Sequence, residues 1–127
     1  MRNMSFSLTT EAYRNHSKTV TRRLGWAFLK PGDVVMAVEK QQGIPKGGHV
    51  IRMHPFEVIS NIAEPLNDIV KRPRRDGVDE TAREGFPGLL SWQFVSMFCR
   101  HNHCDTCAVV HRIEFRHLDA EDLQSCP

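Results

Sequence analysis

Long apolar runs are missing from this chain of 127 residues, and none approaches the roughly 18 residues that a membrane-spanning helix needs. The first residues (Met1 to Phe6) also lack the apolar segment and the cleavage site of a secretory signal. We therefore expect a cytoplasmic protein with no membrane partner, whose four cysteines stay reduced. The net charge of +2 is too small to imply non-specific binding to nucleic acid.

The remaining composition is that of an ordinary globular protein, with 40% hydrophobic and 25% charged residues. A chain of this length can bury enough apolar surface to fold without a disulfide or a metal ion. We expect a single domain over residues 1–127, with its core at about 4–118 and a C-terminal tail at 119–127.

Positive charge is unevenly distributed along the chain. Residues 14–30 contain no acid and five basic residues, which are Arg14, Lys18, Arg22, Arg23 and Lys30. A second basic run covers 71–75, and acidic residues gather after 118. A basic face on a nearly neutral body suits a phosphate-bearing or nucleoside-like ligand, although single runs of this kind are often solvated surface charge.

Hydrophobic periodicity and turn residues predict strands separated by loops, with short helices between them. The expected strands cover 4–9, 34–38, 49–62 and 108–118, and the expected helices begin at residue 10 or cover 80–84 and 91–99. Pro55 interrupts the third strand, which indicates an edge strand or a bulge there. Residues 64–78 are expected to form a loop, and Gly85 is expected just after the second helix.

Lys18 and Thr21 form the pair of residues best suited to chemistry. A threonine hydroxyl is a poor nucleophile until a base removes its proton, and a lysine can act as that base when burial or nearby cations lower its pKa. Residues 18 and 21 face opposite sides of a flat strand, so joint action requires a turn or an irregular segment over 17–21. Glu84 is the expected partner in proton transfer, and Arg23 could stabilise an oxyanion.

The motif Lys18-x-x-Thr21-x-Arg23, followed by a Lys-Pro-Gly-Asp turn into the strand at 34–38, resembles the ASCH domain. Further similar elements follow in order at 64–66, 84–86, 92–98 and 112–115. Many members have glycine two residues before the motif lysine, where this chain has His16. ASCH domains are a branch of the PUA-like superfamily, so the resemblance implies an α+β fold. The specific expectation is a small PUA-like mixed β-barrel with two or three short inserted helices.

The chain is also similar to small bacterial ASCH proteins that hydrolyse N4-acetylcytidine. The resemblance implies that Lys18, Thr21 and Glu84 are catalytic, with Glu80 a weaker match than Glu84. The implied activity is hydrolysis of a non-peptide amide bond in an N4-acylated cytidine or cytosine derivative, without a cofactor. The residues predicted to bind this substrate are Arg22, Arg23 and Phe86. The alternative is an RNA-binding, or RNA-cleaving, PUA-like module without amidase activity.

A cluster of cysteine and histidine favours a third interpretation, a small zinc-dependent interaction module. Its members are Cys99, His101, His103, Cys104 and Cys107, and the last two cysteines have zinc-knuckle spacing. The cluster has no second Cys-x-x-Cys pair, so we assign no metal ligand and expect the fold to be stable without zinc. The histidines on strand-like segments, His49, His54, His111 and His117, are interpreted as surface or core residues, and Cys126 as a free thiol.

Overall fold

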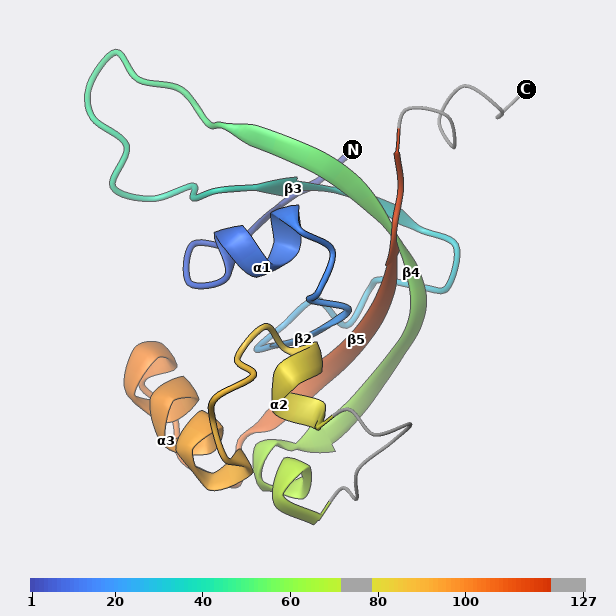
Figure 1. Ribbon diagram of the computed structural model, residues 1–127, viewed down its shortest axis with the longest axis vertical. Helices are drawn as coiled ribbons and strands as arrows, with labels where there is room; N and C mark the ends of the chain where they lie inside the picture. The colour runs from blue at the N-terminus through green and yellow to red at the C-terminus, as the bar shows by residue number, and fades with distance from the viewer. Residues whose placement is uncertain (72–78, 120–127) are drawn as a thin grey trace.

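The computed structural model describes residues 1–71 and 79–119 (Figure 1). Within these residues, five strands form one curved sheet in the order β1-β3-β4-β5-β2. Their bounds are Asn3–Ser5 for β1, Val20–Arg23 for β2, Val34–Val38 for β3, Arg52–Pro65 for β4 and Val109–His117 for β5. β1 is parallel to β3, and the other neighbouring strands are antiparallel. The sheet is therefore mixed, as predicted.

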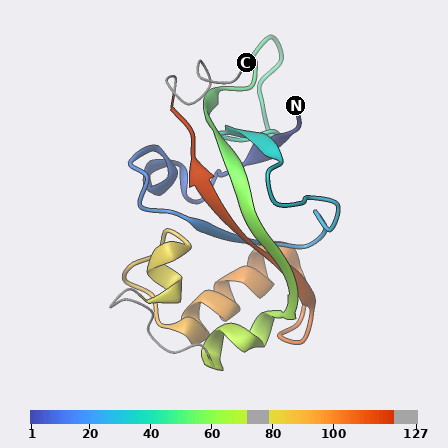
Figure 2. The same ribbon diagram turned by 90° about the vertical axis from the view of Figure 1, so that its right-hand side faces the viewer.

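The helices are short, and they are α1 (Thr10–Arg14), the 3-10 helix η1 (Leu66–Lys71), α2 (Glu80–Arg83) and α3 (Ser91–Asn102). Helix α1 lies apart from α2, α3 and η1, which gather at the end of the molecule away from the termini (Figures 1 and 2). No helix in the described part of the chain is long and apolar enough to cross a bilayer. The α+β class expected from the sequence is confirmed.

The sheet remains open, which differs from the expected barrel. Among the described residues, no backbone ladder joins the edge strands β1 and β2. A side chain connects these strands instead, because Nη2 of Arg23 donates a hydrogen bond to the carbonyl oxygen of Ser5 at 2.6 Å. A five-stranded sheet with a three-residue edge strand has few backbone groups available for complete closure.

Several element boundaries differ from the sequence predictions. The strand at 34–38 is confirmed, whereas β1 ends at Ser5 and β2 was not expected as a strand. Pro55 lies in the central strand β4 rather than at an edge, but the predicted irregularity is present, since the register with β3 shifts beside it. The predicted loop after residue 64 begins instead as η1, and the basic residues at 72–75 lie outside the described residues, as do the tail beyond 119 and Cys126.

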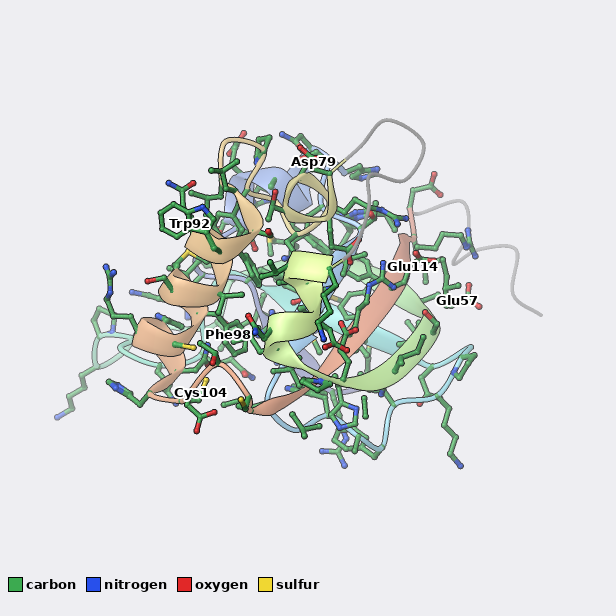
Figure 3. The ribbon with its side chains drawn as sticks, turned by 90° about the horizontal axis from the view of Figure 1, so that it is seen from below. Glu57, Asp79, Trp92, Phe98, Cys104 and Glu114 are labelled. Atoms are coloured by element: carbon green, nitrogen blue, oxygen red, sulfur yellow. The ribbon has the colours of Figure 1, made fainter. Side chains whose placement is uncertain are left out.

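Two apolar clusters occupy opposite faces of β5, because side chains alternate along a strand. Ile113 and Phe115 contribute to the larger cluster, which includes residues from β1, α1, β3 and β4. Val110 belongs to the smaller cluster beneath η1 and α3. In the view from below (Figure 3), Phe98 of α3 points toward the centre of the molecule, whereas Trp92 lies on the outer side. This arrangement leaves Arg112, on the Val110 face, directed toward α2.

Replacing Gly85 with alanine is expected to destabilise the fold. Its added Cβ would lie 3.1 Å from side-chain carbons of Thr9 and Ala12, and the backbone φ is +97°. Left-handed strain and overpacking together predict a loss of about 2–4 kcal/mol in the free energy of unfolding, measured by urea denaturation. Gly32→Ala is the matched control, because Gly32 has a φ of +94° but open space around it. Equal losses in the two variants would contradict a close approach at Gly85.

Candidate active site

Lys18 lies in an irregular segment between α1 and β2. Such a segment was expected from the sequence if Lys18 and Thr21 were to act together. His16 turns the chain after α1 with a φ of +68°, the left-handed conformation that glycine adopts most easily. The backbone N–H of Lys18 then bonds to Ala12, and that of Thr19 bonds to Arg83. His16 therefore adopts a left-handed backbone conformation at the turn that precedes Lys18.

Glu84 meets Lys18 at the end of α2, where it is the C-cap residue. The ammonium Nζ of Lys18 lies 2.5 Å from the carbonyl oxygen of Glu84 and 3.4 Å from its carboxylate Oε1. Both residues are only 2% exposed. Burial lowers the pKa of Lys18 to about 8, with the Glu84 carboxylate acting in the opposite direction and Arg23 adding to the decrease. The amine is thus mostly protonated at neutral pH, with a minor neutral fraction that an ordinary lysine lacks.

Thr21 and Arg23 project from the same face of β2, since they are two residues apart on the strand. Nε of Arg23 donates a hydrogen bond to the hydroxyl oxygen of Thr21 at 3.0 Å. The guanidinium also lies over the ring of Phe6, 4.9 Å from its centroid. The Arg23 side chain is therefore held by the Thr21 hydroxyl, the Ser5 carbonyl and the Phe6 ring. In this position it can stabilise negative charge on the Thr21 oxygen.

Arg22 points to the other face of β2 and is engaged in ion pairs. Its guanidinium contacts one carboxylate oxygen from each of Glu64, Glu80 and Glu84, at 3.2, 2.8 and 2.7 Å respectively. Its side chain has no exposed surface. Arg22 was predicted to bind substrate, and that role remains a prediction, but this geometry favours positioning of Glu84. Glu80 also accepts a hydrogen bond from Arg112, which leaves Glu84 as the acid beside Lys18.

Lys18, Thr21 and Glu84 line one pocket of about 220 Å³, together with Arg23 and Phe86. The structure therefore brings the predicted catalytic residues together, while their catalytic role remains a prediction. Other residues of the wall were not predicted as site residues, among them Phe6, Trp26, Phe94, Met97 and Phe98. The periodic apolar residues of α3 had been interpreted as core alone, yet Phe94 and Phe98 serve both the core and the pocket.

The cysteine and histidine residues at the end of α3 do not gather around a common point. Within residues 1–71 and 79–119, no three of them come close enough to share a metal ion. Cys99 and Cys104 are half-buried against the smaller apolar cluster, Cys107 is exposed, and His101 lines the pocket. Burial, followed by contact with Cys104, raises the pKa of the Cys99 thiol, which favours an inert thiol over a metal-binding thiolate.

Comparison with known proteins adds one structural likeness. No family model and no curated protein matches the sequence. Among solved structures, the chain is similar to the crystal structure of an ASCH domain from Lactobacillus crispatus JV V101, with 12% identity and a TM-score of 0.48. The match covers 91% of this chain and 79% of that one. This level of likeness is too low to carry family membership, which remains the prediction made by the order of the motifs.

The ion pairs of Glu80 are expected to make folding stability sensitive to acid. Although burial opposes it, hydrogen bonding and charge from Arg112 and Arg22 lower the pKa of Glu80 to about 2 from an ordinary value of 4.5. The unfolded chain therefore binds this proton first, so the stabilisation is present above about pH 4.5 and is lost as the pH falls toward 2.

Urea midpoints measured across this pH range should show a smaller pH dependence for Glu80→Gln than for the wild type. Glu57→Gln is the matched control, since Glu57 pairs with Arg116 in an exposed ion pair. An unchanged slope in Glu80→Gln would show that Glu80 does not carry the acid sensitivity.

Proposed function

We propose that this protein is an amidohydrolase that removes the acyl group from N4-acylated cytidine or cytosine derivatives. The observation that carries the proposal is the contact between Arg23 and the Thr21 hydroxyl, inside a pocket that Lys18 and Glu84 also line. A threonine held by a cation, in the same pocket as an amine of lowered pKa, is an arrangement suited to an activated nucleophile.

The contacts of Lys18 with Glu84 are compatible with a role as general base. A neutral amine has two N–H groups and one lone pair, whereas an ammonium has three N–H groups and none. Both contacts of Lys18 with Glu84 need only an N–H donor, so they persist when the amine is neutral. The lone pair is then free to accept the proton of Thr21.

The proposed reaction proceeds through an acyl-enzyme. Oγ1 of Thr21 attacks the acyl carbon while Lys18 takes the hydroxyl proton, and Arg23 faces the negative charge that develops. The C–N bond then breaks, and the exocyclic nitrogen takes the proton from Lys18 to give the free cytosine compound. Water, deprotonated by Lys18, next hydrolyses the threonine ester, releases the carboxylic acid and restores the hydroxyl. Glu84 keeps the lysine amine in place throughout.

The wall of the pocket suits a flat base. Phe86 and Phe94 pack against each other with ring centroids 5.9 Å apart, and Met97 and Phe98 extend the same apolar side. Aromatic walls with a few convergent polar groups are typical of small-molecule sites, and aromatic rings stack readily on nucleobases.

Burial of the basic residues favours this proposal over RNA binding. Of the cations between residues 14 and 30, Lys18 and Arg22 are buried, and Arg14 is paired with Glu39 at 2.7 Å. Phosphate backbones are bound by exposed lysine and arginine side chains, and within 14–30 the exposed cations are Arg14, in its ion pair, and Lys30, so this segment offers little of such a surface.

Thr21→Val should lower kcat for N4-acetylcytidine by roughly 1000-fold or more, because valine keeps the shape but not the nucleophile. Thr21→Ser should retain activity, since it keeps the hydroxyl. The ultraviolet change on deacylation measures the rate, and Thr19→Val is the matched control, because Thr19 lies outside the pocket lining. A wild type inactive on N4-acetyl- and N4-benzoylcytidine, with RNA affinity that falls steeply with salt, would support the alternative function.

Lys18→Met is expected to abolish turnover by a similar factor, because methionine fills the space without supplying a base. Lys30→Met, which changes an exposed lysine, is the control and should leave the rate unchanged. If the two residues act as one unit, the double variant Lys18→Met/Thr21→Val should be about as slow as either single variant. Multiplied losses in the double variant would show that the two side chains act independently.

A further inference from the structure

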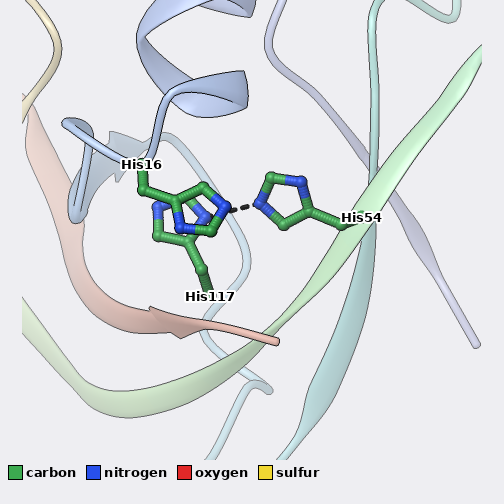
Figure 4. Close-up of side chains that lie close together, drawn as sticks. All are labelled: His16, His54 and His117. Carbon is green, nitrogen blue, oxygen red and sulfur yellow. Dashed lines mark hydrogen bonds between the residues drawn. The ribbon is translucent and has the colours of Figure 1, made fainter. Parts of the chain in front are cut away.

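Three histidines from distant parts of the sequence meet beside the turn that carries Lys18 (Figure 4). His54 belongs to β4, His117 ends β5, and His16 lies between α1 and β2. One ring nitrogen from each lies within 4.8 Å of the others. In the described part of the chain, no other group of three or more potential metal ligands lies this close together. The proposed hydrolase mechanism does not use it.

Hydrogen bonding orients the central ring, that of His117. Its Nε2 lies 2.6 Å from the carbonyl oxygen of Lys18, and a carbonyl only accepts, so Nε2 carries the proton. In the neutral ring the lone pair is therefore on Nδ1, which faces Nε2 of His54 at 2.6 Å. A histidine whose other nitrogen donates to a backbone carbonyl is the usual arrangement of a metal ligand.

The other two rings are held by stacking. His54 lies against Tyr13, with centroids 4.4 Å apart, and the Tyr13 hydroxyl donates to the backbone carbonyl of His54 at 2.7 Å. His16 stacks on His117, with ring centroids 4.3 Å apart and ring planes 5° apart, so the His16 ring turns out of this stack when both rings direct a nitrogen at one ion. Since β4 and β5 are neighbouring strands inside the sheet, two of the rings stand on rigid elements. His16 is exposed, which leaves the group open to an ion from solvent.

Burial affects the charge state of two of these rings. Burial, followed by the neighbouring rings and Arg14, lowers the pKa of His54 to about 4, and burial likewise lowers the pKa of His117. Neutral imidazole is the form that binds metals, and the meeting of the three rings is what suggests a site. The charge of Arg14 is balanced by its ion pair with Glu39.

We propose that His16, His54 and His117 form a binding site for Zn²⁺, with three imidazole ligands and a fourth position open to water. Imidazole suits borderline divalent ions, and three protein ligands are sufficient for zinc. Zinc–nitrogen bonds of about 2.0 Å place tetrahedral ligands about 3.3 Å apart, so the nitrogens of His54 and His117 separate by less than 1 Å on binding. His54 meanwhile moves its proton to Nδ1.

The site goes beyond the proposed hydrolase activity and does not depend on it. Because His117 bonds to the Lys18 carbonyl, a bound ion holds the segment that carries Lys18 against β5. Zinc binding is measured without any deacylation assay, so failure of one proposal leaves the other standing.

The test is calorimetric titration of the metal-free full chain with Zn²⁺. The parent for the titrations is Cys104→Ser/Cys107→Ser, which removes the thiolates most able to compete for zinc. We expect one Zn²⁺ per chain in this parent, and binding weaker by roughly 100-fold or more after either His54→Phe or His16→Gly. The phenylalanine keeps the stacking on Tyr13, and glycine suits the left-handed backbone at position 16. His49→Gln, which changes an exposed loop histidine, should bind like the parent.

Two further measurements make the outcome decisive. Circular dichroism establishes that each variant is folded, and His16→Gly, at an exposed turn, serves as the test if His54→Phe does not fold. Co²⁺ substitution in the wild type should give visible bands of a tetrahedral site without thiolate charge-transfer absorption. Zinc binding that is lost in the cysteine parent, or unchanged in a folded histidine variant, would overturn the proposal.

Discussion

The buried guanidinium of Arg22 connects three carboxylates from two elements, and the arrangement of the site depends on it. Glu64 comes from β4, whereas Glu80 and Glu84 come from α2 and its C-cap. Removing such charges from water is costly, and the cost is offset only when each charge is paired with good geometry. A four-residue helix such as α2 is not stable by itself, so these ion pairs and the packing of Gly85 position it. The contact of Glu84 with Lys18 follows from that placement.

Alternation along the edge strand β2 separates two tasks between neighbouring arginines. Arg22 faces the carboxylates of α2 and β4, while Arg23 faces Thr21 and the carbonyl of Ser5. Among the described residues β2 pairs with β5 alone and no strand covers its other edge, and side chains from both faces of β2 reach the same pocket. The adjacent basic residues that suggested an anionic ligand in the sequence are therefore one cation paired with three carboxylates and one cation beside the Thr21 hydroxyl, and both line the pocket.

Local patterns predicted much of the fold and the members of the site. The strand at 34–38, the helix ending at Gly85 and the apolar residues of α3 follow from periodicity and turn chemistry, and the structure confirms them. Pro55 indicated an edge strand or a bulge, and the structure has the second, since a register shift beside it lets a central strand accommodate the hydrogen bond that proline cannot donate. The partners of Arg22 could not be predicted, since they are separated from it by 42, 58 and 62 residues.

The sequence by itself determined where the chain turns, which residues are apolar, and that Lys18, Thr21, Arg23 and Glu84 occur in a chemically useful order. These properties depend on backbone preferences and on side-chain chemistry, which act within a few residues. Only the tertiary structure decided that Glu84 faces Lys18, that Arg22 is buried, and that His16, His54 and His117 meet. Such meetings are set by how the curved sheet packs its strands and by which charges must be paired once water is excluded, and neither is encoded in a local pattern.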